Sequence, residues 1–91
     1  MSVTVRLPSQ LRALVGGVGE VPVDAATVRE AIVAVDAAYP GIALRVLDDR
    51  GALRRFVNVF VADEDVRFLQ GLDTVLEAGQ TVSLVPAVAG G

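Results

Sequence analysis

The residues of this chain best suited to chemistry are the last two, Gly90 and Gly91. Glycine has no Cβ, so a Gly-Gly ending can be drawn extended through a narrow channel and adopts φ values that other residues avoid. It also leaves the terminal carbonyl unshielded, which suits attack of the carboxylate on a nucleotide phosphate and later attack on the carbonyl by sulfide or an amine. The ends of many chains are also poorly ordered, so from the Gly-Gly ending alone an inert terminus remains an alternative interpretation.

The remainder of the chain contains no recognisable combination of catalytic residues. Its 91 residues include no cysteine, histidine or lysine. This composition excludes thiol nucleophiles, iron–sulfur ligation, most zinc sites and a histidine base for any serine. The densest carboxylate cluster, Asp63-Glu64-Asp65, lacks the alternating spacing around a glycine that a calcium loop requires. We therefore expect neither an enzyme nor a metal site in the body of the chain.

Composition predicts one small ordered domain. The hydrophobic fraction is 53% and the mean hydropathy is +0.56, which argues against disorder. No apolar run approaches the ~20 residues of a membrane span, and residues 1–4 do not resemble a secretory signal, so a cytoplasmic location without a membrane partner is expected. The net charge of −3 and the dispersed arginines argue against nucleic-acid binding.

The first third of the chain predicts a hairpin. Apolar and polar residues alternate over residues 2–7, the period of a strand with one buried face, and Pro8 ends it. The stretch that follows, through Gly19, is expected to be a loop. Residues 20–23 are then a second strand, antiparallel to the first.

A helix follows over residues 28–38. Thr27 and Glu30 form a capping box in which the threonine hydroxyl accepts from the amide of residue 30 and Glu30 reaches back to the amide of residue 27. Apolar residues recur at helical spacing, which predicts one face packed on a sheet. They are Val28, Ala31, Ile32, Val35 and Ala38. The helix is expected to end at Tyr39-Pro40-Gly41.

The second half of the chain predicts three further strands. The clearest covers residues 56–61, with its three valines on the buried side. After an acidic turn, a brief strand is expected over residues 66–68. A last strand runs over residues 81–85 and ends at Pro86.

Shorter elements connect these strands. Residues 42–47 are ambiguous between a short helix and an extended segment, and residues 48–51 predict a turn. Residues 71–78 are expected to hold a short helical turn with Leu72, Val75 and Leu76 packed inward.

This element order predicts an α+β fold, a mixed sheet packed on one main helix. With the last strand beside the first, it is the β-grasp, or ubiquitin-like, roll. Residues 1–86 are expected to form this domain, and residues 87–91 a flexible Gly-Gly tail.

The open face of the predicted sheet offers a candidate docking patch for a partner protein. Exposed aromatic residues on a polar face are typical interface anchors. The patch would comprise Phe60, Phe56, Arg6, Arg55 and Val85. The alternatives left open are that residues 42–53 cover one of the two rings, and that the arginines are merely solvated.

The end of the chain resembles a known family. Residues 82–91 (VSLVPAVAGG) look like the strand–proline–tail ending of the ThiS/MoaD sulfur carriers. Upstream, residues 55–61 (RFVNVFV) and 63–68 (DEDVRF) resemble the CysO branch in particular. The resemblance is strong from residue 52 onward, whereas before the helix only the order of the elements matches.

The resemblance implies a function as a protein co-substrate. A ubiquitin-activating-like enzyme would use ATP to adenylate the Gly91 carboxylate, and sulfide from a sulfurtransferase would displace AMP to leave a thiocarboxylate. Ala87, Val88, Ala89 and Gly90 would thread into the partners' active sites. In the CysO branch, a cysteine-synthase relative acting on O-phosphoserine takes the sulfur, and a metalloprotease then releases the product. The carrier itself would bind no cofactor.

Three alternatives stay open at this point. The chain could be a ubiquitin-like modifier joined to lysines of other proteins. It could also carry sulfur for molybdopterin, thiamin or a sulfur-containing secondary metabolite rather than for cysteine. The third alternative is a β-grasp interaction domain whose terminus is inert.

Overall fold

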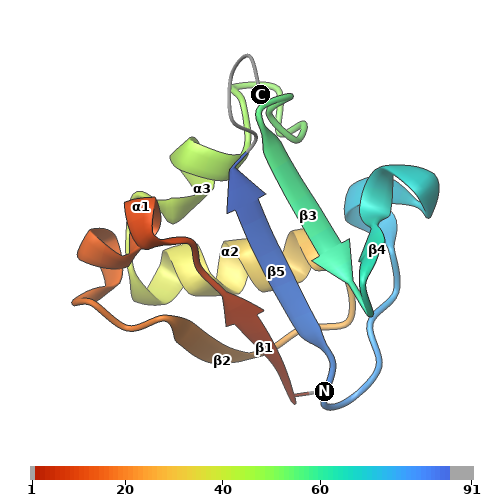
Figure 1. The fold of residues 1–91 in the computed structure, drawn as a ribbon, viewed down its shortest axis with the longest axis horizontal. Helices are drawn as coiled ribbons and strands as arrows, with labels where there is room; N and C mark the ends of the chain where they lie inside the picture. Colours follow the sequence, from red (N-terminus) through yellow and green to blue (C-terminus); the bar gives the residue numbers. More distant parts are fainter. Residues whose placement is uncertain (1, 87–91) are drawn as a thin grey trace.

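A computed structural model of the chain describes residues 2–86 and contains one five-stranded sheet, in the order β2-β1-β5-β3-β4 (Figure 1). The strands are β1 (Ser2–Arg6), β2 (Glu20–Asp24), β3 (Val57–Val61), β4 (Glu64–Asp65) and β5 (Thr81–Pro86). The helices are α1 (Ser9–Arg12), α2 (Val28–Ala38) and α3 (Ile42–Val46). Three 3₁₀ turns complete the set: η1 (Ala13–Val15), η2 (Val66–Phe68) and η3 (Gly71–Asp73).

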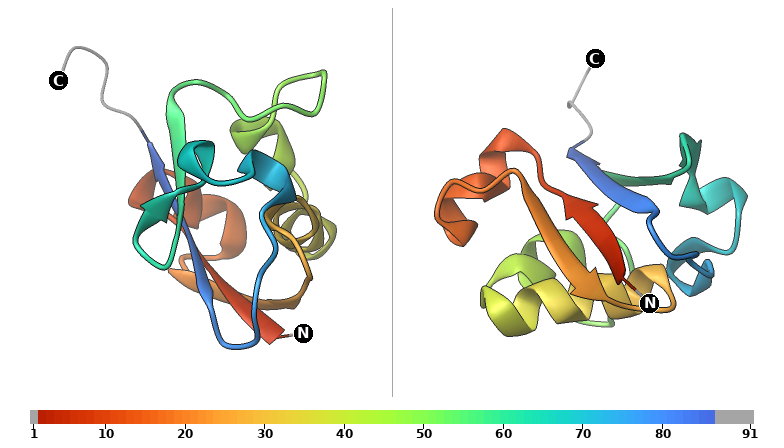
Figure 2. Two further views of the ribbon diagram at one scale, coloured as in Figure 1. Left: turned by 90° about the vertical axis from the view of Figure 1, so that its right-hand side faces the viewer. Right: turned by 90° about the horizontal axis from the view of Figure 1, so that it is seen from below.

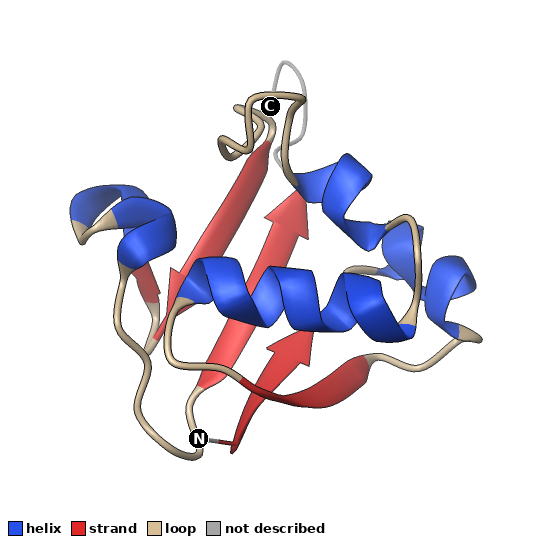
Figure 3. Cartoon of the chain, turned by 180° about the vertical axis from the view of Figure 1, so that it is seen from behind, coloured by secondary structure: helices blue, strands red, loops and turns tan. Residues whose placement is uncertain are grey.

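The sheet is mixed, and the last strand lies at its centre. β1 pairs antiparallel with β2 and parallel with β5, and β5 pairs antiparallel with β3. Seen from behind, α2 crosses the strands, and views at right angles place it against one face of the sheet (Figures 2 and 3). The predicted β-grasp arrangement, with the final strand beside the first, is therefore confirmed.

The core lies between this helix and the sheet. Val28, Ala31, Ile32 and Val35 of α2 are buried, as the helical spacing predicts. The three valines of β3 are buried as well, which confirms the predicted orientation of that strand. The other sheet face carries more polar side chains, and we call it the open face.

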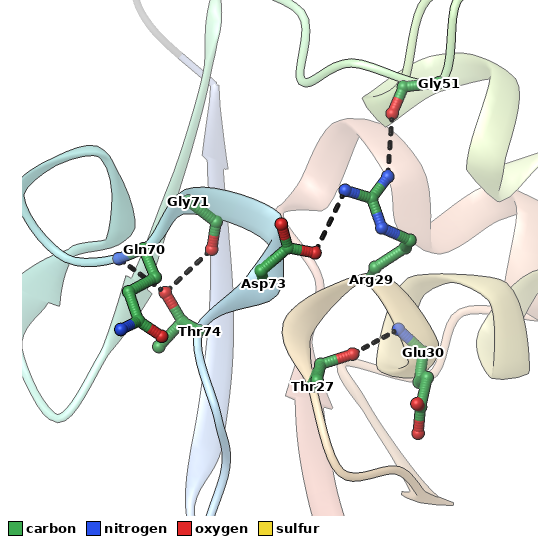
Figure 4. A network of polar contacts seen from close by, with 8 residues as sticks. All are labelled: Thr27, Arg29, Glu30, Gly51, Gln70, Gly71, Asp73 and Thr74. Atoms are coloured by element: carbon green, nitrogen blue, oxygen red, sulfur yellow. Dashed lines mark hydrogen bonds and ion pairs between the residues drawn. The ribbon is translucent and has the colours of Figure 1, made fainter.

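The cap of α2 differs from the prediction in one contact. The amide of Glu30 donates to the Thr27 hydroxyl at 3.2 Å, as expected (Figure 4). The Glu30 carboxylate accepts instead from the amide of Ala26, at 3.0 Å, and not from that of Thr27. The Glu30 side chain thus reaches one residue further back, although Thr27 has the extended backbone usual for an N-cap, with φ −135° and ψ 165°.

The sequence pattern did not predict two short helical segments. The stretch expected as a loop after Pro8 begins with α1 and η1, in which Val15 is buried. The ambiguous residues 42–47 form helix α3, and the Asp36 carboxylate accepts from the amides of Gly41 and Ala43 at 3.0 Å each. This side chain stabilises the start of α3, which has no capping residue of its own.

The predicted strand over residues 66–68 is wrong. Ala62 and Asp63 have positive φ (53° and 66°) and form a two-residue hairpin loop, so β4 begins at once and is only two residues long. The Asp65 carboxylate then accepts from the amide of Arg67 at 2.8 Å and starts the 3₁₀ turn η2.

The prediction for residues 71–78 is correct in part. A helical turn is present as η3, and Leu72 and Leu76 are buried. Val75, however, is 66% exposed because it follows the turn in an extended stretch bridged to Thr27. Thr74 is buried in its place, and its hydroxyl donates to the carbonyl of Gly71 and accepts from the amide of Gln70 (Figure 4).

Candidate functional site

The tail joins the body at the end of the central strand. Pro86, the last described residue, pairs with Val57 at the start of β3. On its other side, β5 pairs with β1 only as far as Ser83. Residues 84–86 therefore have one strand neighbour only, so the chain leaves the sheet beside an open strand edge. The predicted tail residues Ala87, Val88, Ala89, Gly90 and Gly91 lie outside the described residues.

A mostly apolar hollow lies beside this exit. Its volume is about 230 Å³. The lining residues come from α1, α3, β3 and β5, and they include Pro8, Leu11, Arg45, Phe56, Val85 and Pro86. We call it the root hollow. Neither Pro8 nor Pro86 has a backbone N–H, so this edge of the sheet offers few donors to an added strand.

A second hollow lies on the open face. Arg6, Ser83 and Phe60 follow one another across β1, β5 and β3 in the strand register. Together with Ala62, Asp63, Gln80 and Thr81 they line a space of about 310 Å³, which we call the face hollow. The Arg6 guanidinium also pairs with the exposed Glu20 carboxylate at 3.1 Å. Such an exposed pair contributes little stability, so Arg6 remains available to a partner.

The five candidate docking residues are divided between these two places. Arg6 and Phe60 belong to the face hollow, whereas Phe56 and Val85 belong to the root hollow. Arg55 is exposed and lines a shallow depression with Phe56. Phe56 is 59% exposed, so the alternative that residues 42–53 cover this ring is wrong. Phe60 is partly buried within its hollow.

The depression beside Phe56 is held by the loop of residues 48–52. Backbone hydrogen bonds from Ala52 and then Arg50 lower the pKa of Asp48, because both amides favour its ionised form. Arg54 donates to the carbonyl of Leu44 at 3.0 Å and fixes the end of α3 against this loop. These contacts position Phe56 without placing any reactive group nearby.

Two further arginines are structural. Arg67 donates to the carbonyls of Arg54 and Val57 and to the side-chain oxygen of Asn58, at 2.8–3.1 Å. Arg29 on α2 joins the carbonyl of Gly51 to the carboxylate of Asp73 (Figure 4). Both side chains connect distant parts of the chain, so they are not free to recognise a partner's anion.

The sequence interpretation missed one exposed aromatic residue. Phe68 was assigned to a strand, yet it is 85% exposed at the end of η2. In a strand it would share a face with Val66, which is completely buried. The preceding Asp65, a residue that caps short turns, is the signal that could have indicated the change of direction.

Among residues 2–86, no group of three or more His, Cys, Asp or Glu side chains is placed to hold a metal ion. Within the same range, no helix is long and apolar enough to cross a bilayer.

Comparison with known proteins gives the family context. The sequence model of the ThiS family matches residues 5–91. The sulfur carrier protein CysO of Mycobacterium tuberculosis is 45% identical over 93 aligned residues, and the alignment covers 100% of both chains. Small archaeal modifier protein 3 of Haloferax volcanii is 40% identical over 68 residues, which cover 75% of this chain and 73% of that protein.

A solved structure is similar over nearly the whole fold. The crystal structure of the Amycolatopsis orientalis BexX/CysO complex contains a chain that superposes with a TM-score of 0.91 at 45% identity. The superposition covers 98% of this chain and 99% of that chain. The similarity in backbone fold thus extends over the strand that leads to the tail.

Proposed function

Since the match over residues 5–91 establishes that this chain belongs to the ThiS family, we propose that it is a sulfur carrier whose reactive group is the carboxylate of Gly91. The observation that carries the proposal is the end-to-end alignment with a CysO sulfur carrier at 45% identity. The position of Pro86 at the end of the central strand supports it, because the rigid sheet then presents residues 87–91 to a partner.

The proposed chemistry takes place on partner enzymes. A carboxylate oxygen of Gly91 attacks the α-phosphorus of ATP, and pyrophosphate leaves, to give an acyl adenylate. Sulfide, supplied by a sulfurtransferase, then attacks the carbonyl carbon, and AMP leaves, so that a thiocarboxylate remains. The five tail residues span about 16 Å when extended, enough to reach a recessed active site.

The body contributes presentation and no catalysis to these steps. The chain has no cysteine or histidine to take part in acyl or sulfur transfer. It also has no lysine, so no side-chain amine of its own can capture the activated Gly91 carbonyl. These absences suit a co-substrate whose terminal carbonyl is its only reactive centre.

We further propose that the sulfur serves cysteine biosynthesis in the cytoplasm, because a relative that aligns over its full length at 45% identity is a CysO protein. The acceptor would be a cysteine-synthase-like enzyme using O-phosphoserine, and a metalloprotease would release the cysteinyl product. Delivery to molybdopterin, thiamin or a sulfur-containing secondary metabolite is the alternative. The solved complex of a CysO protein with BexX supports the more general proposal that the fold docks on other proteins.

A second candidate function is a ubiquitin-like modifier. The observation that favours it is the 40% identity to small archaeal modifier protein 3 of Haloferax volcanii. Both functions begin with adenylation of the terminal carboxylate, and they differ in the nucleophile that follows. A modifier would be attacked by a lysine of another protein, whereas a carrier would be attacked by sulfide.

Intact-mass measurement tests the proposal. The purified chain is incubated with its organism's adenylating enzyme, ATP and sulfide. Exchange of one carboxylate oxygen for sulfur is expected to add about 16 Da, and omission of ATP should remove the gain. Heavier species joined through partner lysines would support the modifier instead. An unchanged mass under every condition would overturn both functions.

The face hollow is the proposed docking place for the adenylating enzyme. Replacing Phe60 by arginine is expected to raise the KM for the carrier at least about tenfold, because a charge replaces the ring beside Arg6. Phe60→Ala should give a smaller increase, which separates loss of the ring from added repulsion. The measurement is pyrophosphate release against carrier concentration. Adenylation of Phe60→Arg at the normal rate would remove this docking role.

A further inference from the structure

Phe68 is the most exposed large apolar side chain of the described residues. It is 85% exposed, and its neighbour Leu69 is 43% exposed. Both lie outside the root hollow and the face hollow. Burying an exposed aromatic ring of this size in a partner's pocket is a large favourable contribution to binding.

The backbone that carries Phe68 is held in place. Val66 is completely buried, and the amide of Leu69 donates to its carbonyl at 2.9 Å. The Asp65 carboxylate fixes the amide of Arg67, and the Arg67 guanidinium binds the start of β3 at two points and the carbonyl of Arg54 just before it. The ring is therefore presented from an ordered turn, so little backbone entropy is lost when a partner binds it.

The same contacts tie the turn η2 to the end of the sheet from which the tail leaves. Arg67 donates to the carbonyl of Val57 at 2.8 Å, and Val57 pairs with Pro86. The turn η2 thus lies beyond β3 at the end of the sheet from which residues 87–91 leave, at the outer edge of the molecule (Figure 1). An enzyme surface that receives the tail would meet this edge.

The segment that carries Phe68 is acidic in its sequence. Residues 62–73 hold four carboxylates and one arginine, whereas the rest of the chain holds seven of each. The whole net charge of −3 therefore resides in this segment. Asp65 pairs with Arg67 and Asp73 with Arg29, while Asp63 lines the face hollow. Among the residues that the structure describes, Glu64 forms no ion pair and is exposed.

We propose that Phe68 and Leu69, together with the exposed Glu64 of the same segment, form a second docking surface that fits an apolar socket bordered by Lys or Arg on the adenylating enzyme. The inference rests on the proposed carrier function and adds a partner contact to it. The ring supplies affinity, and the Glu64 carboxylate supplies orientation and a faster encounter with a basic surface.

The test is steady-state adenylation of the full chain by its organism's adenylating enzyme. Phe68→Ala is expected to raise the KM for the carrier about tenfold, with kcat within about twofold of wild type. Phe68→Leu should recover part of the difference. Val33→Ala is the matched control, because Val33 is 54% exposed on α2, away from both hollows, and it should behave as wild type.

The charge component has its own variants. Glu64→Gln, which alters neither hollow, is expected to raise KM about twofold at low salt, and the difference should shrink at high salt as screening increases. Glu77→Gln changes the net charge equally and should have a smaller effect.

Two results would overturn the inference, and they are distinguishable. If wild type is adenylated and Phe68→Ala has the KM of Val33→Ala, the second docking surface does not exist. If wild type itself is not adenylated, the proposed function fails and this inference fails with it. The thermal midpoint of Phe68→Ala should match wild type, because a side chain so exposed contributes little to folding.

Discussion

Deletion of Gly91 is expected to abolish adenylation and thiocarboxylate formation while leaving the folded body intact. The deletion withdraws the terminal carboxylate by one residue, about 3.5 Å along an extended chain. Misplacement of a reacting group by about 1 Å already costs around 100-fold in rate, so we expect a loss of at least about 1,000-fold. Pyrophosphate release and intact mass are the measurements.

Two controls show that position is what matters. A chain lengthened by one glycine should fail as well, although it still ends in Gly-Gly. The chain without Gly91 should compete with the full-length carrier for the adenylating enzyme, because its described surfaces, residues 2–86, are unchanged. Normal activation of the shortened chain would contradict the assignment of the reaction to Gly91.

Replacement of Ile32 by alanine is expected to lower the free energy of unfolding by about 3 kcal/mol, a typical cost for a large side chain removed from a core. Ile32 is completely buried on the face of α2 that packs on the sheet. Because each kcal/mol shifts the midpoint of a domain this size by about 4–8 °C, Tm should fall by roughly 15 °C. Chemical and thermal denaturation measure both values.

The neighbouring residue provides the control for this prediction. Val33→Ala removes apolar atoms from the same helix, but at a position that is 54% exposed. Its free energy of unfolding should stay within about 0.5 kcal/mol of wild type. Equal effects at both positions would contradict the burial pattern that defines the core.

The long periodic elements could be predicted from the sequence because their pattern is the pattern of burial. Alternation over β1 and β3, and helical spacing over α2, each place apolar groups on one face, and tertiary packing uses that face. The segments at α1, η2 and α3 are three to five residues long, too short for a period to be read. Their conformation depends on contacts from elsewhere, such as Asp36 with the start of α3.

The candidate site, too, could be predicted only in part from the sequence. Gly90 and Gly91 stand out by residue type and position, and the open-face location of Phe60 follows from alternation in β3. Phe68 could not be placed, because alternation with Val66 assigns it to the wrong side. The root hollow could not be predicted from the sequence either, because its lining residues Pro8 and Leu11 are far from Val85 along the chain.

The most direct test of the account is to locate the added sulfur within the chain. Trypsin cleaves after Arg67, and no later arginine or lysine occurs, so one peptide contains residues 68–91. The gain of about 16 Da should appear on this peptide and on its terminal Gly91 fragment. Oxidation of methionine adds a similar mass, about 16 Da, but the only methionine is Met1 at the other end. A gain confined to any residue other than Gly91 would contradict the central claim that this family member carries sulfur on its C-terminal carbonyl.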